Sequence, residues 1–189
     1  MNLNLTSIFI SKHKMNNMSK VDILNNYGYR SIYYIDQNNL IQGDYLIYHP
    51  NGNLSIQSYY INDTKHGMYR QYYDNGLLEE EKEFNNGLLN GWSRTWHCNG
   101  NLMNEFYCIN GQAQGLYKGW CEDGYLEVEY SYNDGKKHGI FMTWYPKGGI
   151  MSMEFYVNNL KEGCHFYYKK SGEIDEQQYY LNGIPNSTS

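Results

Sequence analysis

The chain has 189 residues and a formal net charge of −5; 17% of its residues are aromatic and 19% are charged. This acidic balance gives no electrostatic attraction toward nucleic-acid phosphates and disfavours anionic membranes. No stretch approaches the roughly 18 apolar residues of a membrane-spanning helix, and the amino terminus lacks the basic and apolar regions of a signal peptide. We therefore expect a cytoplasmic (intracellular) protein that binds no nucleic acid.

The first 42 residues differ from the rest of the chain. Residues 1–20 are polar and Asn-rich, and we expect them to be disordered or to cross the first strand. Residues 21–42 form a degenerate unit, in which Gly28 keeps its place while Arg30 and Asp36 occupy sites that are apolar elsewhere. Such a unit is typical of the cap of a repeat array.

Residues 43–186 predict six tandem repeats of 24 residues. One glycine opens each repeat, at Gly43, Gly67, Gly91, Gly115, Gly139 and Gly163. A second series, the turn glycines, occupies the tenth position, at Gly52, Gly76, Gly100, Gly124, Gly148 and Gly172. We number positions within a repeat from the opening glycine, and residues 187–189 are a short tail.

Three further positions keep their chemistry. The sixth is aromatic, in Tyr48, Tyr72, Trp96, Trp120, Trp144 and Tyr168. The twelfth is aliphatic, in Leu54, Leu78, Leu102, Leu126, Ile150 and Ile174. The eighteenth is apolar or aromatic, in Tyr60, Phe84, Cys108, Tyr132, Tyr156 and Tyr180. We expect the sixth and twelfth positions to form the structural ladder of the fold.

Each repeat contains two turn signals separated by short aromatic segments, which indicates β-hairpins rather than helices. For the first turn we predict a three-residue loop with only the glycine in the left-handed region, because Lys147 and Ser171 would tolerate a positive φ poorly. Identical repeats must return to the same face, so we expect an odd number of loop residues in the second turn as well. The sixth, twelfth and eighteenth positions would then share one face. If both turns were two-residue loops, the side chains at the sixth and twelfth positions would lie on opposite faces of the sheet.

The predicted fold is all-β: an elongated antiparallel β-hairpin repeat array, an open twisted sheet of six 24-residue units with terminal caps. On its other face we expect the third and seventeenth positions, which carry a second aromatic stripe. This candidate interaction surface comprises Tyr45, Tyr69, Tyr117 and Phe141 together with Tyr59, Tyr107, Phe155 and Tyr179. The alternative is that these rings pack against one another across the strands.

The chemistry-bearing residues form no catalytic or metal constellation. Glu79, Glu81 and Glu83 would share one strand face by alternation, and we expect a solvated face there, because no histidine or other catalytic partner recurs nearby. The cysteines form no CxxC pair, which argues against a zinc site. We predict no catalytic residue, metal or cofactor.

The glycine, aromatic, Asn-Gly and leucine spacing resembles the MORN repeat, in the variant found in bacterial antitoxin-like proteins, large DNA viruses and protists. The segments from Gly67 to His97 and from Gly115 to Gly139 carry the resemblance most clearly. It implies an antiparallel hairpin array used for protein interaction, scaffolding or membrane association, and not an enzyme. For lipid binding, the basic side chains at the fourth position are the candidates: Arg70, Arg94 and Lys118.

Two functions follow. The first is a non-catalytic scaffold that binds an unidentified protein partner or self-associates. The second is peripheral membrane association through Arg70, Arg94 and Lys118, which the acidic charge of the chain disfavours. Carbohydrate binding is a weaker alternative. Cell-surface repeats of similar length also stack aromatic residues, but they belong to exported proteins, and no export signal is visible in this sequence. A bias toward Asn, Tyr and Ile is compatible with a viral or protist source.

Overall fold

The computed structural model describes residues 7–9 and 17–186. The chain divides into an N-terminal part, residues 1–91, and a C-terminal part, residues 92–189. The described strands of the N-terminal part are β1 (Ser7–Phe9), β2 (Ser19–Leu24), β3 (Arg30–Ile35), β4 (Ile41–Tyr48), β5 (Leu54–Ile61), β6 (Thr64–Lys65), β7 (Gly67–Tyr72) and β8 (Leu78–Asn85). Strand β9 (Leu88–Trp96) crosses the division between the parts.

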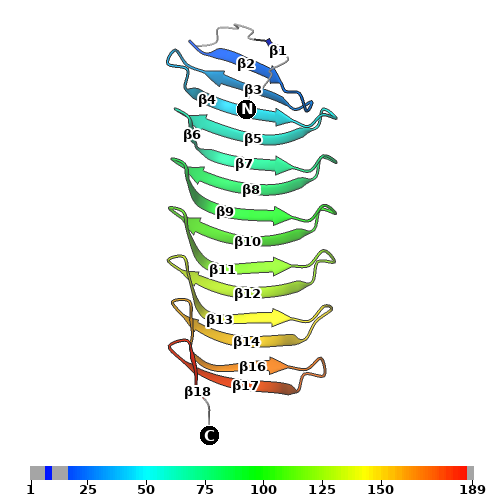
Figure 1. Cartoon of the computed structure of the whole chain (residues 1–189), viewed down its shortest axis with the longest axis vertical. Helices are drawn as coiled ribbons and strands as arrows, with labels where there is room; N and C mark the ends of the chain where they lie inside the picture. Colours follow the sequence, from blue (N-terminus) through cyan, green and yellow to red (C-terminus); the bar gives the residue numbers. More distant parts are fainter. Residues whose placement is uncertain (1–6, 10–16, 187–189) are drawn as a thin grey trace. The chain divides into compact units, whose positions relative to one another are not determined.

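The C-terminal part continues the pattern of short strands and tight turns (Figure 1). Its strands are β10 (Leu102–Ile109), β11 (Gln112–Trp120), β12 (Leu126–Asn133), β13 (Lys136–Trp144), β14 (Ile150–Val157), β15 (Leu160–Lys161), β16 (Gly163–Tyr168), β17 (Ile174–Leu181) and β18 (Ile184–Asn186). Consecutive strands pair antiparallel in each part. Residues 7–9 and 17–186 contain no helix. The prediction of an all-β array of antiparallel hairpins is therefore confirmed.

The first turn of each repeat is a three-residue loop, as predicted. In the first repeat, Gly52 N donates to His49 O at 2.9 Å and His49 N donates to Asn53 O at 2.8 Å. The glycine has φ of 89°, whereas Asn51 keeps a negative φ. This is a type I turn followed by a left-handed glycine, which places Tyr48 opposite Leu54.

The first turn of repeat five departs from this geometry. Gly148 N still donates to Tyr145 O at 3.1 Å, but Lys147 has φ of 72°. Proline at the second place of the turn followed by a left-handed residue is typical of a type II turn. The expectation that Lys147 would avoid a positive φ is therefore wrong, whereas Ser171 in repeat six keeps a negative φ, as expected.

The prediction for the second turn is wrong. In the first repeat both Asn62 and Asp63 have positive φ, 49° and 61°, and Ile61 pairs directly with Thr64. The same pattern recurs at Asn86-Gly87, Asn110-Gly111, Asp134-Gly135, Asn158-Asn159 and Asn182-Gly183. These are two-residue type I′ turns, whose twist matches that of the flanking strands.

The odd residue is instead absorbed by a β-bulge at the thirteenth position. Ile47 pairs with Ile56, yet Tyr48 pairs with Leu54, so Ser55 is an extra residue on its strand. Equivalent shifts occur in the hairpins of repeats two, four, five and six. The register shifts again at the opening glycine of the next repeat. Tyr60 pairs with Lys65 before Gly67, and Gln57 pairs with Arg70 after it. Gly67 itself has a φ of 72°. Gly43, Gly67, Gly115, Gly139 and Gly163 therefore lie at register shifts and not in turns.

These bulges change which positions share a face. Tyr45 pairs with Ser58, and alternation along β5 puts Tyr60 on that same face and Tyr59 on the opposite one. We call the first the ring face; it carries the third, sixteenth and eighteenth positions. The opposite, ion-pair face carries the second, fourth, fifteenth and seventeenth. The sixth position, with its partner at the twelfth, follows the ion-pair face by alternation, so the expectation that it shares a face with the eighteenth is wrong.

Burial is concentrated on the ring face. The side chains that are almost fully buried include Ser58, Ser93, Cys108 and His165, which occupy the sixteenth, third, eighteenth and third positions. Ser58, Ser93 and Cys108 are small, whereas His165 is a large side chain that is fully buried. The ring face is therefore the packed side within each part.

The degenerate unit pairs with the first repeat. Strand β3 joins β4, with Arg30 opposite Tyr48, and Arg30 also binds Asp22 on β2 in a salt bridge of 2.7 Å. Within the segment 1–20, residues 7–9 form β1, which pairs with β2. The expectation of disorder for residues 1–6 and 10–16 lies outside the described residues.

Candidate interaction surfaces

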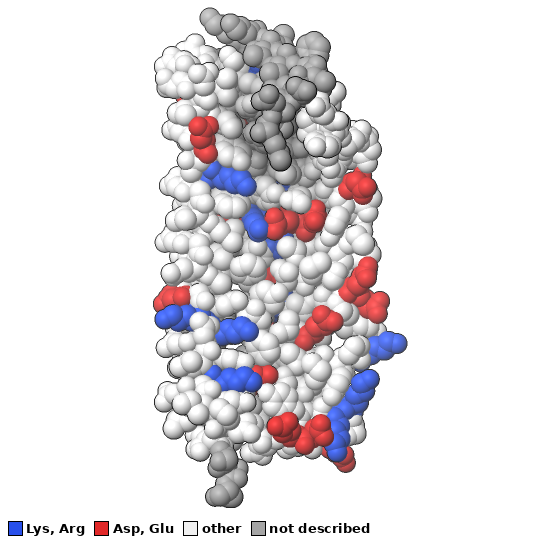
Figure 2. Space-filling model, viewed as in Figure 1, with Lys and Arg blue, Asp and Glu red and all other residues white. Residues whose placement is uncertain are grey.

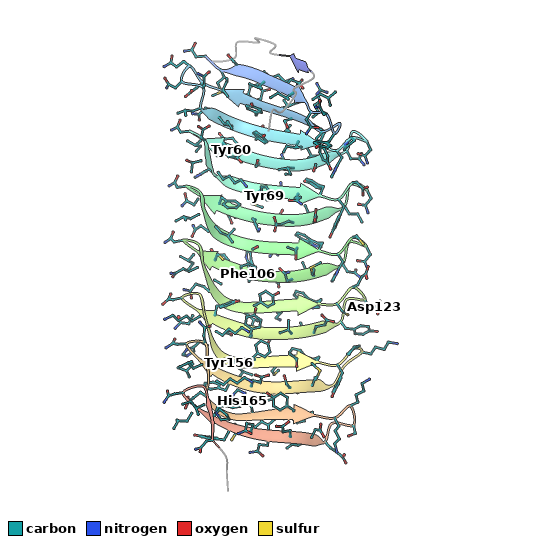
Figure 3. All side chains as sticks on the ribbon, viewed as in Figure 1. Tyr60, Tyr69, Phe106, Asp123, Tyr156 and His165 are labelled. Atoms are coloured by element: carbon teal, nitrogen blue, oxygen red, sulfur yellow. The ribbon has the colours of Figure 1, made fainter. Side chains whose placement is uncertain are left out.

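The ring face of the C-terminal part is a continuous stack of aromatic side chains. Tyr117 and Tyr130 stack with ring centroids 4.6 Å apart, and Tyr130 and Phe141 with centroids 5.0 Å apart. The stack extends to Phe106 on one side and Tyr156 on the other, each at 5.8 Å. The labelled rings of Phe106 and Tyr156 project from the same face of the sheet in Figure 3. Stacked pairs of this kind contribute about 0.5–1.5 kcal/mol each beyond the area that they bury.

The N-terminal part has the same arrangement. Tyr45 lies between Tyr33 and Tyr60, with ring centroids 5.0 Å and 5.6 Å away. Tyr69 meets Phe84 edge-on at 6.2 Å. The third-position residues Tyr45, Tyr69, Tyr117 and Phe141 are thus packing residues, and the prediction that they share a face with the seventeenth position is wrong.

Three lysines that follow second turns lie over these rings. The Nζ atom of Lys65 is 4.4 Å from the Tyr69 ring centroid, that of Lys137 is 4.6 Å from Phe141, and that of Lys161 is 5.0 Å from Tyr180. These are cation–π distances. The visible face in Figure 2 is formed mostly by uncharged side chains, and in the C-terminal part basic side chains lie along both edges.

A part-buried polar cluster lies beside Tyr156 in the ring stack of the C-terminal part. Glu154 Oε2 accepts hydrogen bonds from Tyr156 Oη at 2.8 Å and from Lys161 Nζ at 3.0 Å. Burial alone would raise the pKa of Glu154, but the hydrogen bonds from Lys161 and Tyr156, together with the positive charge of Lys161, leave the pKa below its ordinary value. Burial, and then the hydrogen bond to Glu154, raises the pKa of Tyr156 to about 12. The cluster therefore holds an ionised carboxylate at neutral pH.

His165 occupies the third position of repeat six, where four of the other five repeats carry a Tyr or Phe ring. Its side chain is fully buried between Tyr156 and Tyr180, with ring centroids 6.0 Å and 4.6 Å away. Its Nε2 lies 3.1 Å from Phe155 O. No motif in the sequence marks His165 as a site residue, and its place in the repeat indicates a packing role.

The ion-pair face is named for a row of charged pairs at the fourth and fifteenth positions. Arg70 Nε lies 2.8 Å from Glu81 Oε2, Arg94 Nε lies 3.2 Å from Glu105 Oε2, and Lys118 Nζ lies 3.4 Å from Glu129 Oε2. All three candidate lipid contacts thus have a carboxylate partner. A neutralised pair attracts an anionic headgroup much less than a free cation does.

Beside this row lie exposed apolar side chains at the second and seventeenth positions. Ile140 and Phe155 face each other in register, 54% and 38% exposed, and Trp92 contacts Tyr107 edge-on at 5.5 Å. Met68, Leu116, Tyr59 and Tyr179 are exposed at the same positions. Of the predicted aromatic stripe, only Tyr59, Tyr107, Phe155 and Tyr179 lie on this outer surface.

The acidic run is divided between the two faces. Glu81 pairs with Arg70 on the ion-pair face, whereas Glu79 accepts a hydrogen bond of 2.9 Å from Gln71, which pairs with Glu80 on the other face. The bulge at Glu79 therefore breaks the expected alternation. Among residues 7–9 and 17–186, no group of three or more His, Cys, Asp and Glu side chains could hold a metal ion.

A protein-family model described as a MORN repeat variant matches residues 41–62, 65–86 and 137–158. The matches begin at the same position of the repeat, at Ile41, Lys65 and Lys137, and each includes one first turn with its two strands. Among curated proteins, no sequence matches the chain. The described part of the chain holds no helix of the length and apolarity that crossing a membrane requires. The 24-residue period, the antiparallel hairpins and the matched segments agree, and the chain belongs to the MORN-repeat proteins.

Proposed function

We propose that this protein is a non-catalytic scaffold that binds a protein partner through its ion-pair face. MORN repeats are generally modules for protein or membrane association, and the family is typically non-catalytic. The proposal is more specific in two respects: the partner is a protein and not a membrane, and it binds the ion-pair face. A second copy of the chain belongs to the same class of partner.

The observation that carries the proposal is the paired exposure of apolar side chains at the second and seventeenth positions. Ile140 and Phe155 lie side by side on neighbouring strands, and each keeps more than a third of its surface exposed. Soluble monomeric proteins rarely expose contiguous apolar patches larger than a few hundred Å², and such patches mark interaction sites. Apolar and aromatic side chains beside hydrogen-bonded charges are also the usual composition of protein interfaces.

Membrane association through the fourth position has less support. Arg70, Arg94 and Lys118 are engaged by glutamates on the neighbouring strand. The net charge of −5 adds a repulsion that a basic patch would have to overcome. The geometry offers no specific support for carbohydrate binding.

The test is affinity capture from a lysate of the source cell with the full chain and the double variant Ile140→Ser, Phe155→Ser. We expect the parent to retain a partner that the folded double variant loses. The control is Leu77→Ser, which removes an exposed apolar side chain next to a first turn and outside the second and seventeenth positions, and should leave capture unchanged. Equal capture by parent and double variant would refute the choice of face, and sedimentation with anionic vesicles without any protein partner would favour the membrane function.

A further inference from the structure

The ion-pair face of the C-terminal part carries a regular row of tryptophans, which we call the Trp row. Trp96 on β9, Trp120 on β11 and Trp144 on β13 all occupy the sixth position. Aliphatic side chains on the intervening strands separate them, because Trp120 pairs with Leu126 and Trp144 pairs with Ile150. All three indole side chains are half-buried and none is covered completely. Bulky rings thus alternate with smaller aliphatic side chains across the strands.

The period of this row matches that of a polyproline II helix. Neighbouring strands lie about 4.7–4.9 Å apart. Tryptophans on every second strand therefore lie twice that distance apart, about 9.5 Å. A polyproline II helix rises about 3.1 Å per residue with three residues per turn, so every third side chain recurs after about 9.3 Å. A ligand in this conformation that crosses the strands therefore stays in register with successive repeats.

We propose that the Trp row binds a proline-rich segment of a partner in the polyproline II conformation. The proposal rests on the proposed function and names the chemistry of the partner. Prolines three residues apart would lie over Leu102 and Leu126, between the rings of Trp96, Trp120 and Trp144. Aromatic-lined grooves suit such ligands because the ligand is already extended and loses little conformational entropy on binding.

The charge beside Trp120 favours a basic side chain in the ligand there, whereas the first turn after Trp144 carries the exposed Lys147. Glu122 and Asp123 are exposed in the first turn that directly follows Trp120, and Asp123 is labelled at that edge in Figure 3. Among the described residues neither carboxylate forms a salt bridge with Lys or Arg. A lysine or arginine within the proline-rich segment would complement them. A second copy of this chain does not fit, because its 3 prolines are isolated and supply no pair three residues apart.

The first experiment is a titration of the full chain with a capped peptide of four Pro-Pro-Lys triplets, followed by calorimetry and tryptophan fluorescence. The control peptide has four Gly-Gly-Lys triplets, with the same charge and no polyproline II preference. We expect saturable binding of the first peptide and at least ten-fold weaker binding of the second. Absence of saturable binding, or equal binding of both peptides, would overturn the inference.

Variants locate the peptide on the surface. Trp120→Leu should weaken binding at least ten-fold, whereas Trp92→Leu, on the same face but outside the row, should change it less than two-fold. Equal losses in both variants would contradict the Trp row. The joint variant Glu122→Gln, Asp123→Asn lies in an exposed turn and gives a second measurement that does not depend on the folding of Trp120→Leu. It should weaken binding several-fold at low salt, with the effect lost at about 1 M salt, and no change at low salt would refute the charge argument.

The outcome separates this inference from the proposed function. If Ile140→Ser, Phe155→Ser abolishes partner capture and no proline-rich peptide binds, only the chemistry assigned to the partner is wrong. If neither experiment detects binding to the ion-pair face, both the function and the inference fail.

Discussion

The imidazole Nε2 of His49 lies 2.8 Å from the backbone carbonyl oxygen of Tyr72, in the next repeat. His97 has the same relation to Trp120 at 2.9 Å, and Tyr145 Oη donates to Tyr168 O at 2.6 Å. In these three repeats the side chain at the seventh position therefore links the first turn to the following repeat. Asn51 and Asn53 add hydrogen bonds of 2.8 Å to Asp74 O in the following turn.

His49→Ala should lower the free energy of unfolding by about 1 kcal/mol, because it leaves a part-buried carbonyl without its donor. Tyr145→Phe, which removes only the hydroxyl, should cost a similar amount. Urea denaturation followed by circular dichroism measures both. His49→Gln, which keeps a donor, should recover part of the loss, and equal stability of parent and His49→Ala would show that this contact contributes nothing.

Lys147→Gly should stabilise the protein by about 0.5–1 kcal/mol, since glycine adopts a positive φ without the steric cost that lysine bears. The matched control is Ser171→Gly at the same place in repeat six. Ser171 has a negative φ, so glycine there only adds freedom to the unfolded chain and should be neutral or slightly destabilising. Thermal unfolding of the two variants tests the difference, and stabilisation of the same size in both would contradict the role of the left-handed conformation.

Tyr117→Ala should destabilise the protein by about 2–3 kcal/mol, because the ring is stacked on Tyr130 within the packed face. Tyr107→Ala, on the ion-pair face with 38% of its surface exposed, should cost less than about 1 kcal/mol. The measurement is the midpoint of chemical denaturation for each variant. A larger loss for Tyr107→Ala would reverse the assignment of the two faces.

Glu154→Gln should remove stability that depends on pH. The pKa of Glu154 is lower in the folded chain than its ordinary value of 4.5, so its contribution is fully present above that pH and is lost as the pH falls through the folded value. At neutral pH we expect the variant to be less stable by about 2 kcal/mol, as for hydrogen bonds to a charged group. Denaturation at pH values from about 7 down to about 3 should show this difference shrinking. Glu127→Gln, at an exposed carboxyl, is the control, and a gap between parent and Glu154→Gln that is independent of pH would contradict the linkage.

Several features of the fold could be predicted from local sequence. The repeat period, the hairpins and the three-residue first turn follow from the recurrence of Gly52 and its equivalents. The pairing of Tyr48 with Leu54 then follows from the length of that loop. Turn chemistry acts over four or five residues, so it is visible in a single sequence.

The candidate surfaces could be predicted only in part. The sequence identified the aromatic residues at the third and seventeenth positions but placed them together, whereas Tyr45 packs in the ring face and Tyr59 is exposed on the other. The ion pairs of Arg70 with Glu81 and of Arg94 with Glu105 connect neighbouring strands. They depend on the register and cannot be read from composition.

The sequence by itself determined the architecture: a 24-residue period, strands joined by turns rich in Asn, Asp and Gly, and rings at constant places in each repeat. Only the tertiary structure decided which rings lie inside and which outside. The physical reason is that a single bulged residue, such as Ser55, reverses the alternation of every side chain beyond it on the strand. That bulge is set by hydrogen bonds between neighbouring strands, and no residue type at the thirteenth position predicts it.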